Sequence, residues 1–198
     1  MINNIEQIKG LLDFEKPGDF YMLYVFKRKK DQPEGEKDNH QSVRTIKTYC
    51  IESIDHLDRR YEEIKQICEM FKARAYIHVQ KQNHSDVSLE MLQQLAQRIK
   101  NGQPNQKGLF DSVVGQIKTQ EKRWIVDVDG PTPVALHGII DSLRPEGPKV
   151  IAIIPTKNGK HFITERFDVL KFKQMFPNID IQKKNPTLLY YPKSLDNV

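Results

Sequence analysis

The sequence lacks the features that mark membrane, secreted and disulfide-rich proteins. No apolar run approaches bilayer-spanning length, and the N-terminus has no basic segment followed by a long apolar one. Only two cysteines occur, Cys50 and Cys68, each alone in an apolar-patterned segment. This pattern indicates core thiols in a reducing compartment rather than a disulfide or a zinc site. We therefore expect a cytoplasmic protein with no membrane partner and no structural zinc.

The chain also lacks an internal repeat, a low-complexity tract and a linker between independent domains. Its 198 residues suffice for one full domain or for two small ones that share a core. The net charge of +5 permits nucleic-acid binding without requiring it. We expect a single compact domain over residues 1–198, with an N-terminal α/β half at 1–118 and a second half at 119–198.

The N-terminal half alternates strand and helix patterns. A short helix with Ile5, Ile8 and Leu12 on one face precedes strands expected at 20–26, 43–51 and 73–79, with an amphipathic helix at 55–71. We interpret 43–79 as a β-α-β unit whose helix covers one face of a sheet. Two further helices are expected. One has Leu89, Leu92, Leu95 and Ile99 as its buried stripe, and the other spans 109–117 with Phe110, Val113, Val114 and Ile117 inward.

Four consecutive basic residues lie at the base of a long polar segment between the first two strands: Lys27, Arg28, Lys29 and Lys30. They could bind a phosphate backbone. Acidic residues follow them at Asp31, Glu34, Glu36 and Asp38, so a solvated hairpin tip is the favoured interpretation. His78, which ends the third strand without a partner in the sequence, is interpreted as structural.

The second half has a β-α-β-β-α-β order. Strands are expected at 124–128, 149–154, 160–167 and 179–182, with a terminal strand at 187–191, and helices at 134–143 and 168–176. Thr132 is a candidate cap for the first helix, with Pro133 in its first turn. The expected fold is therefore α+β: a ferredoxin-like or RNA-recognition-motif-like half at about 122–192, packed with an N-terminal β-α-β unit flanked by helices.

Two aspartates follow an apolar run in the first strand of this half. Asp127 and Asp129 are expected on the same side of the strand, because side chains alternate faces. Converging carboxylates repel unless a cation lies between them, and Mg²⁺ or Mn²⁺ with a phosphate-bearing ligand is the usual solution. The hairpin that follows supplies possible cationic contacts in Lys157, Lys160 and His161. Gly159 would let the backbone turn tightly and approach a phosphate.

The order of these elements resembles the catalytic core of archaeo-eukaryotic-type primases and primase-polymerases, in a small bacterial or phage-like version. The resemblance rests on Asp127-x-Asp129, on Gly159-x-His161 preceded by Thr156 and Lys157, and on the later Asp180. It implies that Asp127, Asp129 and Asp180 bind the divalent metal and that His161 contacts the triphosphate. Thr156, Lys157, Gly159 and Lys160 would complete the nucleotide site.

The resemblance further implies a metal-dependent nucleotidyltransferase that adds nucleotides to a nucleic-acid strand in DNA replication. Its partners would be nucleic acid and nucleoside triphosphates, with a helicase or other replication protein as a candidate. The family's zinc-binding segment and extra helical module are not visible, so a minimal or inactive core is also an expectation. A two-metal mechanism requires Asp180 to lie near Asp127.

Two alternatives remain open. A haloacid-dehalogenase-like phosphatase would use Asp127 as nucleophile and Asp129 as general acid/base. It requires a parallel sheet, whereas the primase-like fold requires an antiparallel strand at 160–167. A non-catalytic nucleic-acid-binding module would need exposed aromatic residues on the central strands. The candidates are Tyr76, Trp124 and Phe162, although their apolar neighbours favour core packing.

Overall fold

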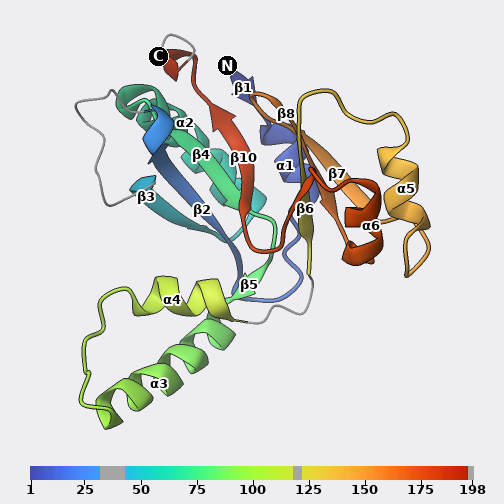
Figure 1. The fold of residues 1–198 in the computed structure, drawn as a ribbon. Helices are drawn as coiled ribbons and strands as arrows, with labels where there is room; N and C mark the ends of the chain where they lie inside the picture. Colours follow the sequence, from blue (N-terminus) through green and yellow to red (C-terminus); the bar gives the residue numbers. More distant parts are fainter. Residues whose placement is uncertain (32–42, 118–121, 196–198) are drawn as a thin grey trace.

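Two antiparallel sheets pack against each other in the computed structural model, which describes residues 1–31, 43–117 and 122–195 (Figure 1). The strand order in the larger sheet is β1-β10-β4-β2-β3, and β5 pairs with one end of β2. These strands are β1 (Ile2–Asn3), β2 (Asp19–Arg28), β3 (Val43–Ile51), β4 (Arg74–His78), β5 (Gln82–Asn83) and β10 (Pro186–Tyr191). The smaller sheet has the order β7-β8-β6-β9. Its strands are β6 (Trp124–Asp129), β7 (Val150–Pro155), β8 (Gly159–Thr164) and β9 (Asp180–Gln182).

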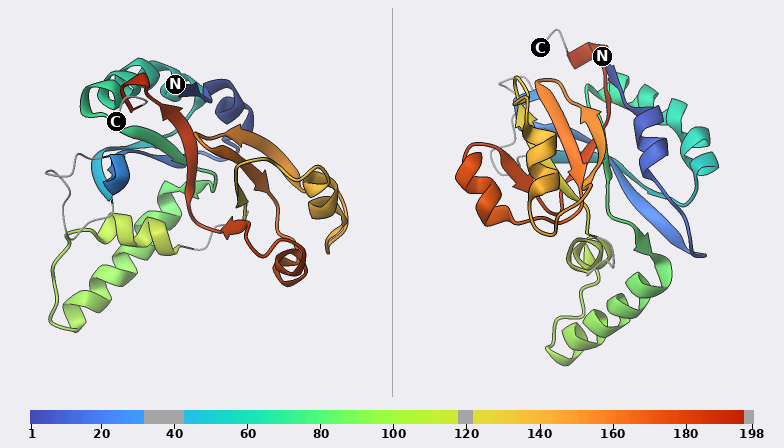
Figure 2. Two further views of the ribbon diagram at one scale, coloured as in Figure 1. Left: turned by 45° about the horizontal axis from the view of Figure 1, so that its top comes forward. Right: turned by 90° about the vertical axis from the view of Figure 1, so that its right-hand side faces the viewer.

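The helices are distributed over three places (Figures 1 and 2). They are α1 (Ile5–Leu11), α2 (Ile54–Phe71), α3 (His84–Lys100), α4 (Leu109–Gln116), α5 (Leu136–Ser142) and α6 (Val169–Met175). Helices α1 and α2 pack in the core of the larger sheet, where α1 also contacts β7 of the smaller one. Helices α5 and α6 cover the smaller sheet, and α3 and α4 form a hairpin that projects from the body. None of the helices in the described ranges is both long and apolar enough to cross a membrane.

The expected β-α-β unit is present, and its helix forms for clear local reasons. The Ser53 hydroxyl caps α2 by accepting a hydrogen bond from the His56 backbone N–H at 3.0 Å. Leu57, Ile64 and Cys68 lie on one face of α2 and are fully buried against the sheet. The helix joins β3 to β4, and β2 lies between these strands and pairs antiparallel with both.

The smaller sheet has a different apolar core on each face. Val126 and Phe162 face α5 and α6, where they pack with Leu136, Ile140 and Phe172. Ile125, Ile154 and Ile163 face the other way and join the core of the larger sheet. Because residues alternate along β6, the face that carries Ile125 also carries Asp127 and Asp129. The site therefore lies on the side of this sheet that faces the larger one.

Three sequence expectations differ from the structure. The terminal strand β10, expected in the C-terminal half, lies between β1 and β4 in the larger sheet, because its fully buried Leu189 packs into that sheet's core. Helix α5 begins at Leu136 with Ala135 at its N-cap, so Thr132 does not cap it. The expected buried stripe of α3 is largely exposed, with Leu89 at 60% and Leu92 at 65%, because the helix packs inward through Val87 instead.

Candidate functional site

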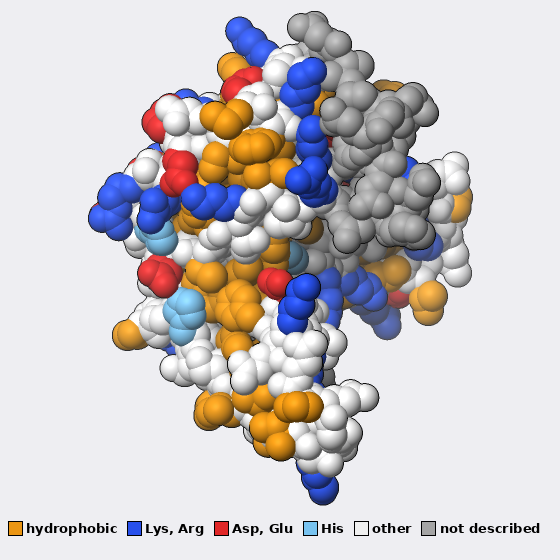
Figure 3. All heavy atoms as spheres, turned by 90° about the vertical axis from the view of Figure 1, so that its left-hand side faces the viewer, with side chains coloured by type: hydrophobic (Ala, Val, Ile, Leu, Met, Phe, Trp, Pro, Cys, Tyr) orange, Lys and Arg blue, Asp and Glu red, His pale blue; other side chains and the backbone are white. Residues whose placement is uncertain are grey.

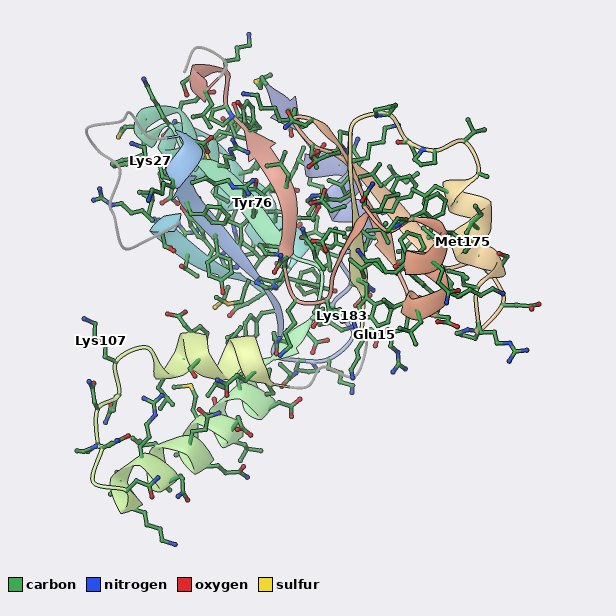
Figure 4. The ribbon with its side chains drawn as sticks, in the orientation of Figure 1. Glu15, Lys27, Tyr76, Lys107, Met175 and Lys183 are labelled. Carbon is green, nitrogen blue, oxygen red and sulfur yellow. The ribbon has the colours of Figure 1, made fainter. Side chains whose placement is uncertain are left out.

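A cleft of about 260 Å³ lies between the two sheets. Its larger-sheet wall comes from β2, β4 and β10, and Tyr76 projects from β4 on this side (Figure 4). Its smaller-sheet wall comes from β6, β8, β9 and the turn between β7 and β8. The residues that line it are Phe26, Arg28, Arg74, Tyr76, Asp127, Asp129, Thr156, Lys157, Asn158, His161, Gln182, Asn185, Pro186 and Leu188. The cleft thus unites both aspartates with the expected hairpin.

Asp127 is the most constrained acid in the cleft. It pairs directly with His161 in the antiparallel register of β6 and β8, and Oδ1 lies 3.4 Å from His161 Nε2. The side-chain amide of Gln182 donates a hydrogen bond to Oδ2 at 3.0 Å. The His161 hydrogen bond is the main influence that lowers the pKa of Asp127 below its usual value, against the effect of burial. Gln182 and the charge of Arg28 act in the same direction as His161.

His161 links the two sheets. Its Nδ1 lies 2.9 Å from the hydroxyl of Thr187, a fully buried residue of β10, in a hydrogen bond. The imidazole is only 7% exposed, and both of its nitrogens have protein partners. His161 also lines the cleft, so the expectation that it contacts a triphosphate stays a prediction. Its imidazole lies between the Asp127 carboxylate and the Thr187 hydroxyl, a position from which it can orient that carboxylate.

Three cationic side chains line the same cleft. Arg74 is buried, lies 2.5 Å from the Asp31 carboxylate and stacks over the Tyr191 ring. The Lys157 ammonium lies 5.0 Å from the centre of that ring. Arg28 is half-buried and acts electrostatically on Asp127. Cations and carboxylates therefore face each other across the cleft, which is the arrangement that a metal-bound polyphosphate needs.

Arg28 and Asp31 correct the interpretation of the basic cluster as a solvated tip. Strand β2 continues through Arg28, so this side chain reaches the cleft. Asp31 is buried because it neutralises Arg74. Glu34, Glu36 and Asp38, which motivated the interpretation, lie outside the described residues.

The hairpin residues divide between the two faces of their sheet. The Thr156 hydroxyl accepts a hydrogen bond from the Gly159 backbone N–H at 3.1 Å, which closes the turn. Gly159 pairs with Asp129, and a Cβ at this position would overlap the Val128 carbonyl oxygen. The glycine therefore permits the close approach of two strands, and its expected approach to a phosphate stays a prediction. Lys160 is exposed, pairs with Val128 on the opposite face from His161 and does not line the cleft.

Asp180 lies on the strand next to Asp127, but its side chain does not line the cleft. The two residues pair in the register of β6 and β9. The Asp180 side chain is exposed, and its Oδ1 accepts a hydrogen bond from the Ile181 backbone N–H at 2.9 Å. Across the parts of the chain that the structure describes, no group of three His, Cys, Asp or Glu side chains is placed to hold a metal. The expected three-acid set is not assembled, and Asp127 and Asp129 are the two acids that line the cleft.

This pair nevertheless suits a divalent cation. Both carboxylates belong to one strand face, and Asp129 is exposed at the mouth of the cleft. Mg²⁺ is commonly held by one or two carboxylates together with substrate phosphates, and its remaining positions are filled by water. The donors present therefore fit one Mg²⁺ or Mn²⁺ ion that arrives with a phosphate-bearing ligand.

Comparison with protein-family models, curated proteins and solved structures finds no match to this chain. The function must therefore be argued from the site itself.

The two alternatives fit the structure less well. The strand expected at 160–167 is β8, and it pairs antiparallel with both β6 and β7. The parallel sheet that the phosphatase needs does not occur among the strands of the described ranges. For the binding module, Phe162 is buried beneath the helices, Trp124 packs edge-on to Phe167 and Tyr76 is only 8% exposed. None of the three is an open stacking platform.

Several residues in or beside the cleft carry no signal in the sequence. Gln182 and Thr187 are ordinary polar residues there, and only the strand pairing brings them to Asp127 and His161. Phe26 and Tyr76 are 50 positions apart, yet their rings stack with centroids 4.7 Å apart and planes within 7°. The pairing of β2 with β4 creates this contact: Phe26 lies opposite Arg74, and Tyr76 lies two residues further along β4 on the same face.

Proposed function

We propose that the cleft binds a nucleoside triphosphate and that the chain is a metal-dependent nucleotidyltransferase of the primase-polymerase type. One observation carries the proposal: the Asp127–His161 pair lies beside Asp129 in a cleft that also contains Arg28 and Lys157. Carboxylates suit the metal and cations suit the phosphates. The product would be a nucleic-acid strand that grows by one nucleotide per cycle.

The topology of the smaller sheet supports the proposal. The element order β6-α5-β7-β8-α6-β9, with strand order β7-β8-β6-β9 and both helices in one apolar core, fits the ferredoxin-like arrangement. Its first strand bears both aspartates and its third bears His161, as the resemblance to primases requires. The N-terminal β-α-β unit supplies the other wall of the cleft through Arg74 and Tyr76.

Asp127 and Asp129 would hold the divalent metal in this proposal. When bound, Mg²⁺ or Mn²⁺ would lower the pKa of an attacking hydroxyl and neutralise charge that develops on the phosphates. We do not assign Asp180 to the metal, because its side chain is exposed and does not line the cleft. A single-metal site completed by substrate phosphates follows from the donors present.

The remaining side chains bind and orient. Arg28 and Lys157 would contact the phosphates, since both are cationic side chains that line the cleft. Thr187 fixes the imidazole of His161, and His161 and Gln182 in turn fix the two oxygens of Asp127. A carboxylate held at both oxygens loses little freedom when a ligand binds.

The decisive experiment measures nucleotide incorporation on a primed template and on an unprimed one, with Mg²⁺ or Mn²⁺. We expect the Asp127→Asn/Asp129→Asn variant to lose at least about 100-fold in rate. The control variant Glu62→Gln/Glu165→Gln also removes two negative charges, from exposed positions outside the cleft, and should keep full activity. Equal incorporation by both variants would refute the proposal.

The same assay separates two roles for His161. A residue that orients Asp127 lowers kcat when it is replaced by Asn and leaves the KM for the nucleotide nearly unchanged, whereas a triphosphate contact raises KM. If the wild-type chain binds nucleic acid but incorporates nothing with either metal, and the double Asn variant binds equally well, the non-catalytic binding module is correct instead.

A further inference from the structure

The helical hairpin of α3 and α4 is the part of the fold that the cleft does not use. Helix α3 starts against the larger sheet, where Val87 packs with Phe20 and Met22, and Val113 of α4 lies in the same core. Beyond this contact α3 runs away from the body, on the outer side of α4 (Figures 1 and 2). Figure 3 shows hydrophobic side chains at the surface of this region.

Those exposed side chains follow a heptad pattern. Leu89, Leu92, Ala96 and Ile99 are separated by three, four and three residues, and all four are exposed, with Ile99 at 58%. This is the a/d spacing by which one helix packs along another. A different stripe of α3, formed by Val87, Met91 and Leu95, already packs within the hairpin. Helix α3 thus has two apolar faces, of which the described parts of the chain cover only one.

The charges beside the exposed stripe indicate what covers it. With Leu89 at a and Leu92 at d, the e positions are Asp86, Gln93 and Lys100. From the N-terminal to the C-terminal end of the helix, these three side chains are negative, neutral and positive. In an antiparallel helix pair, e positions face e positions of the other helix. A two-fold axis near Gln93 therefore places Asp86 opposite Lys100 of a second copy, and does so twice.

The apolar layers agree with the same register. Leu89 would pack on Ile99 of the second copy and Leu92 on Ala96, so that the apolar layers repeat symmetrically about the axis. A parallel pair gives no such match. There the e positions face g positions, which are Ser88 and Leu95 and carry no charge.

We propose that two copies of the chain associate through α3 as an antiparallel, two-fold-symmetric helix pair. The self-complementary stripe is what an isologous contact requires. The 17 residues of α3 span about 25 Å, so the interface belongs to the small class that forms and dissociates readily. With α4 flanking each α3, the assembly has four helices.

One other cause produces the same charge order. A negative residue near a helix N-terminus and a positive one near its C-terminus are favoured by the helix dipole alone. That effect acts within one helix, however, and does not depend on the charges of a second copy. An experiment that changes the two copies separately distinguishes the causes.

The test measures the mass of the full chain by sedimentation over about a hundredfold range of concentration, because weak association follows mass action. We expect a concentration-dependent dimer in the wild type, and a monomer when Leu89, Leu92 and Ile99 are all replaced by Gln. Asp86→Lys alone and Lys100→Asp alone should each weaken the dimer at least about fivefold, by like-charge contact. Glu90→Lys, a charge reversal on the same helix but off the stripe, should leave it unchanged.

The mixture of the two single charge variants decides the pairing. A copy with Asp86→Lys and a copy with Lys100→Asp have complementary charges at both contacts, so the mixture should dimerise as well as the wild type. Circular dichroism of each variant verifies that the helices persist. A wild type that stays monomeric, a dimer that survives the triple Gln variant, or a mixture that fails to associate would each overturn the proposal.

Discussion

His78 makes the stability of this fold depend on pH in a calculable way. It ends β4, lies edge-on to the Tyr24 ring with centroids 5.5 Å apart, and borders a small cavity with Met22 and Val114. Burial in this setting lowers the pKa of His78 from 6.5 to about 4, because the charged imidazolium cannot keep its water. The native state therefore holds His78 neutral over a range where the unfolded chain protonates it.

The sign and size of the effect follow from that pKa. Between pH 6.5 and about 4 the unfolded state binds the extra proton, so the free energy of unfolding falls as the pH falls. The contribution of His78 is complete above pH 6.5 and is lost by about pH 4. At about 1.4 kcal/mol per pKa unit, the total loss is about 3 kcal/mol.

Urea unfolding followed by circular dichroism at several pH values from 7.5 to 4 provides the measurement. His78→Phe keeps an aromatic ring but cannot bind a proton, so the wild type should lose stability relative to this variant as the pH falls. His137→Gln is the control, since His137 is exposed on α5, and its pH profile should parallel that of the wild type. A constant difference between wild type and His78→Phe over this range would refute the reasoning.

Two further predictions concern stability. Gly159→Ala places a Cβ against the backbone carbonyl of the neighbouring strand and should lower the free energy of unfolding by about 1–3 kcal/mol. Gly138→Ala, in a helix with open space around it, should be neutral or stabilising. Equal melting temperatures of the two variants would contradict this prediction. Asp31→Asn leaves Arg74 buried without its counter-ion and should cost about 3–5 kcal/mol in urea unfolding. Asp58→Asn, at an exposed ion pair, should cost at most about 1 kcal/mol, and a similar loss in both variants would show that the buried pair is not special.

Much of the fold follows from local pattern. The apolar period of α2 lies where the sequence indicates, and so does the start of α6 at Asp168, whose carboxylate accepts a hydrogen bond from the Lys171 backbone N–H. The place of β10 does not follow, because its apolar run fits either sheet and only long-range packing selects the larger one. The stripe of α3 misleads for a related reason: periodicity identifies an apolar face but not what covers it.

The site residues divide in the same way, into those that local pattern predicts and those that only long-range packing positions. Alternation along the strand predicts that Asp127 and Asp129 share a face, and the resemblance to primases associates His161 with them; all three line one cleft. The position of Arg28 could not be predicted, because the acidic residues that follow it favour a solvated tip. In the structure β2 extends through Arg28. Lys160 shows the limit of motif spacing. It directly precedes His161 in the sequence, but side chains alternate along the strand, so Lys160 points to the opposite face, away from the cleft.

The geometry around Asp127 depends on how the two sheets dock. His161 reaches from the smaller sheet to Thr187 in the larger one, and the buried amide of Asn4 donates hydrogen bonds at 2.9 Å to the carbonyls of Pro155 and Leu188, one in each sheet. These contacts hold the His161 imidazole in place, and the imidazole in turn orients the Asp127 carboxylate. Because β10 carries both Thr187 and Leu188, a strand from the end of the chain completes a site whose acids lie some 60 positions earlier. In the proposed function, a change that loosens β10 from β4 should therefore lower the rate of nucleotide incorporation through the displaced Asp127 carboxylate.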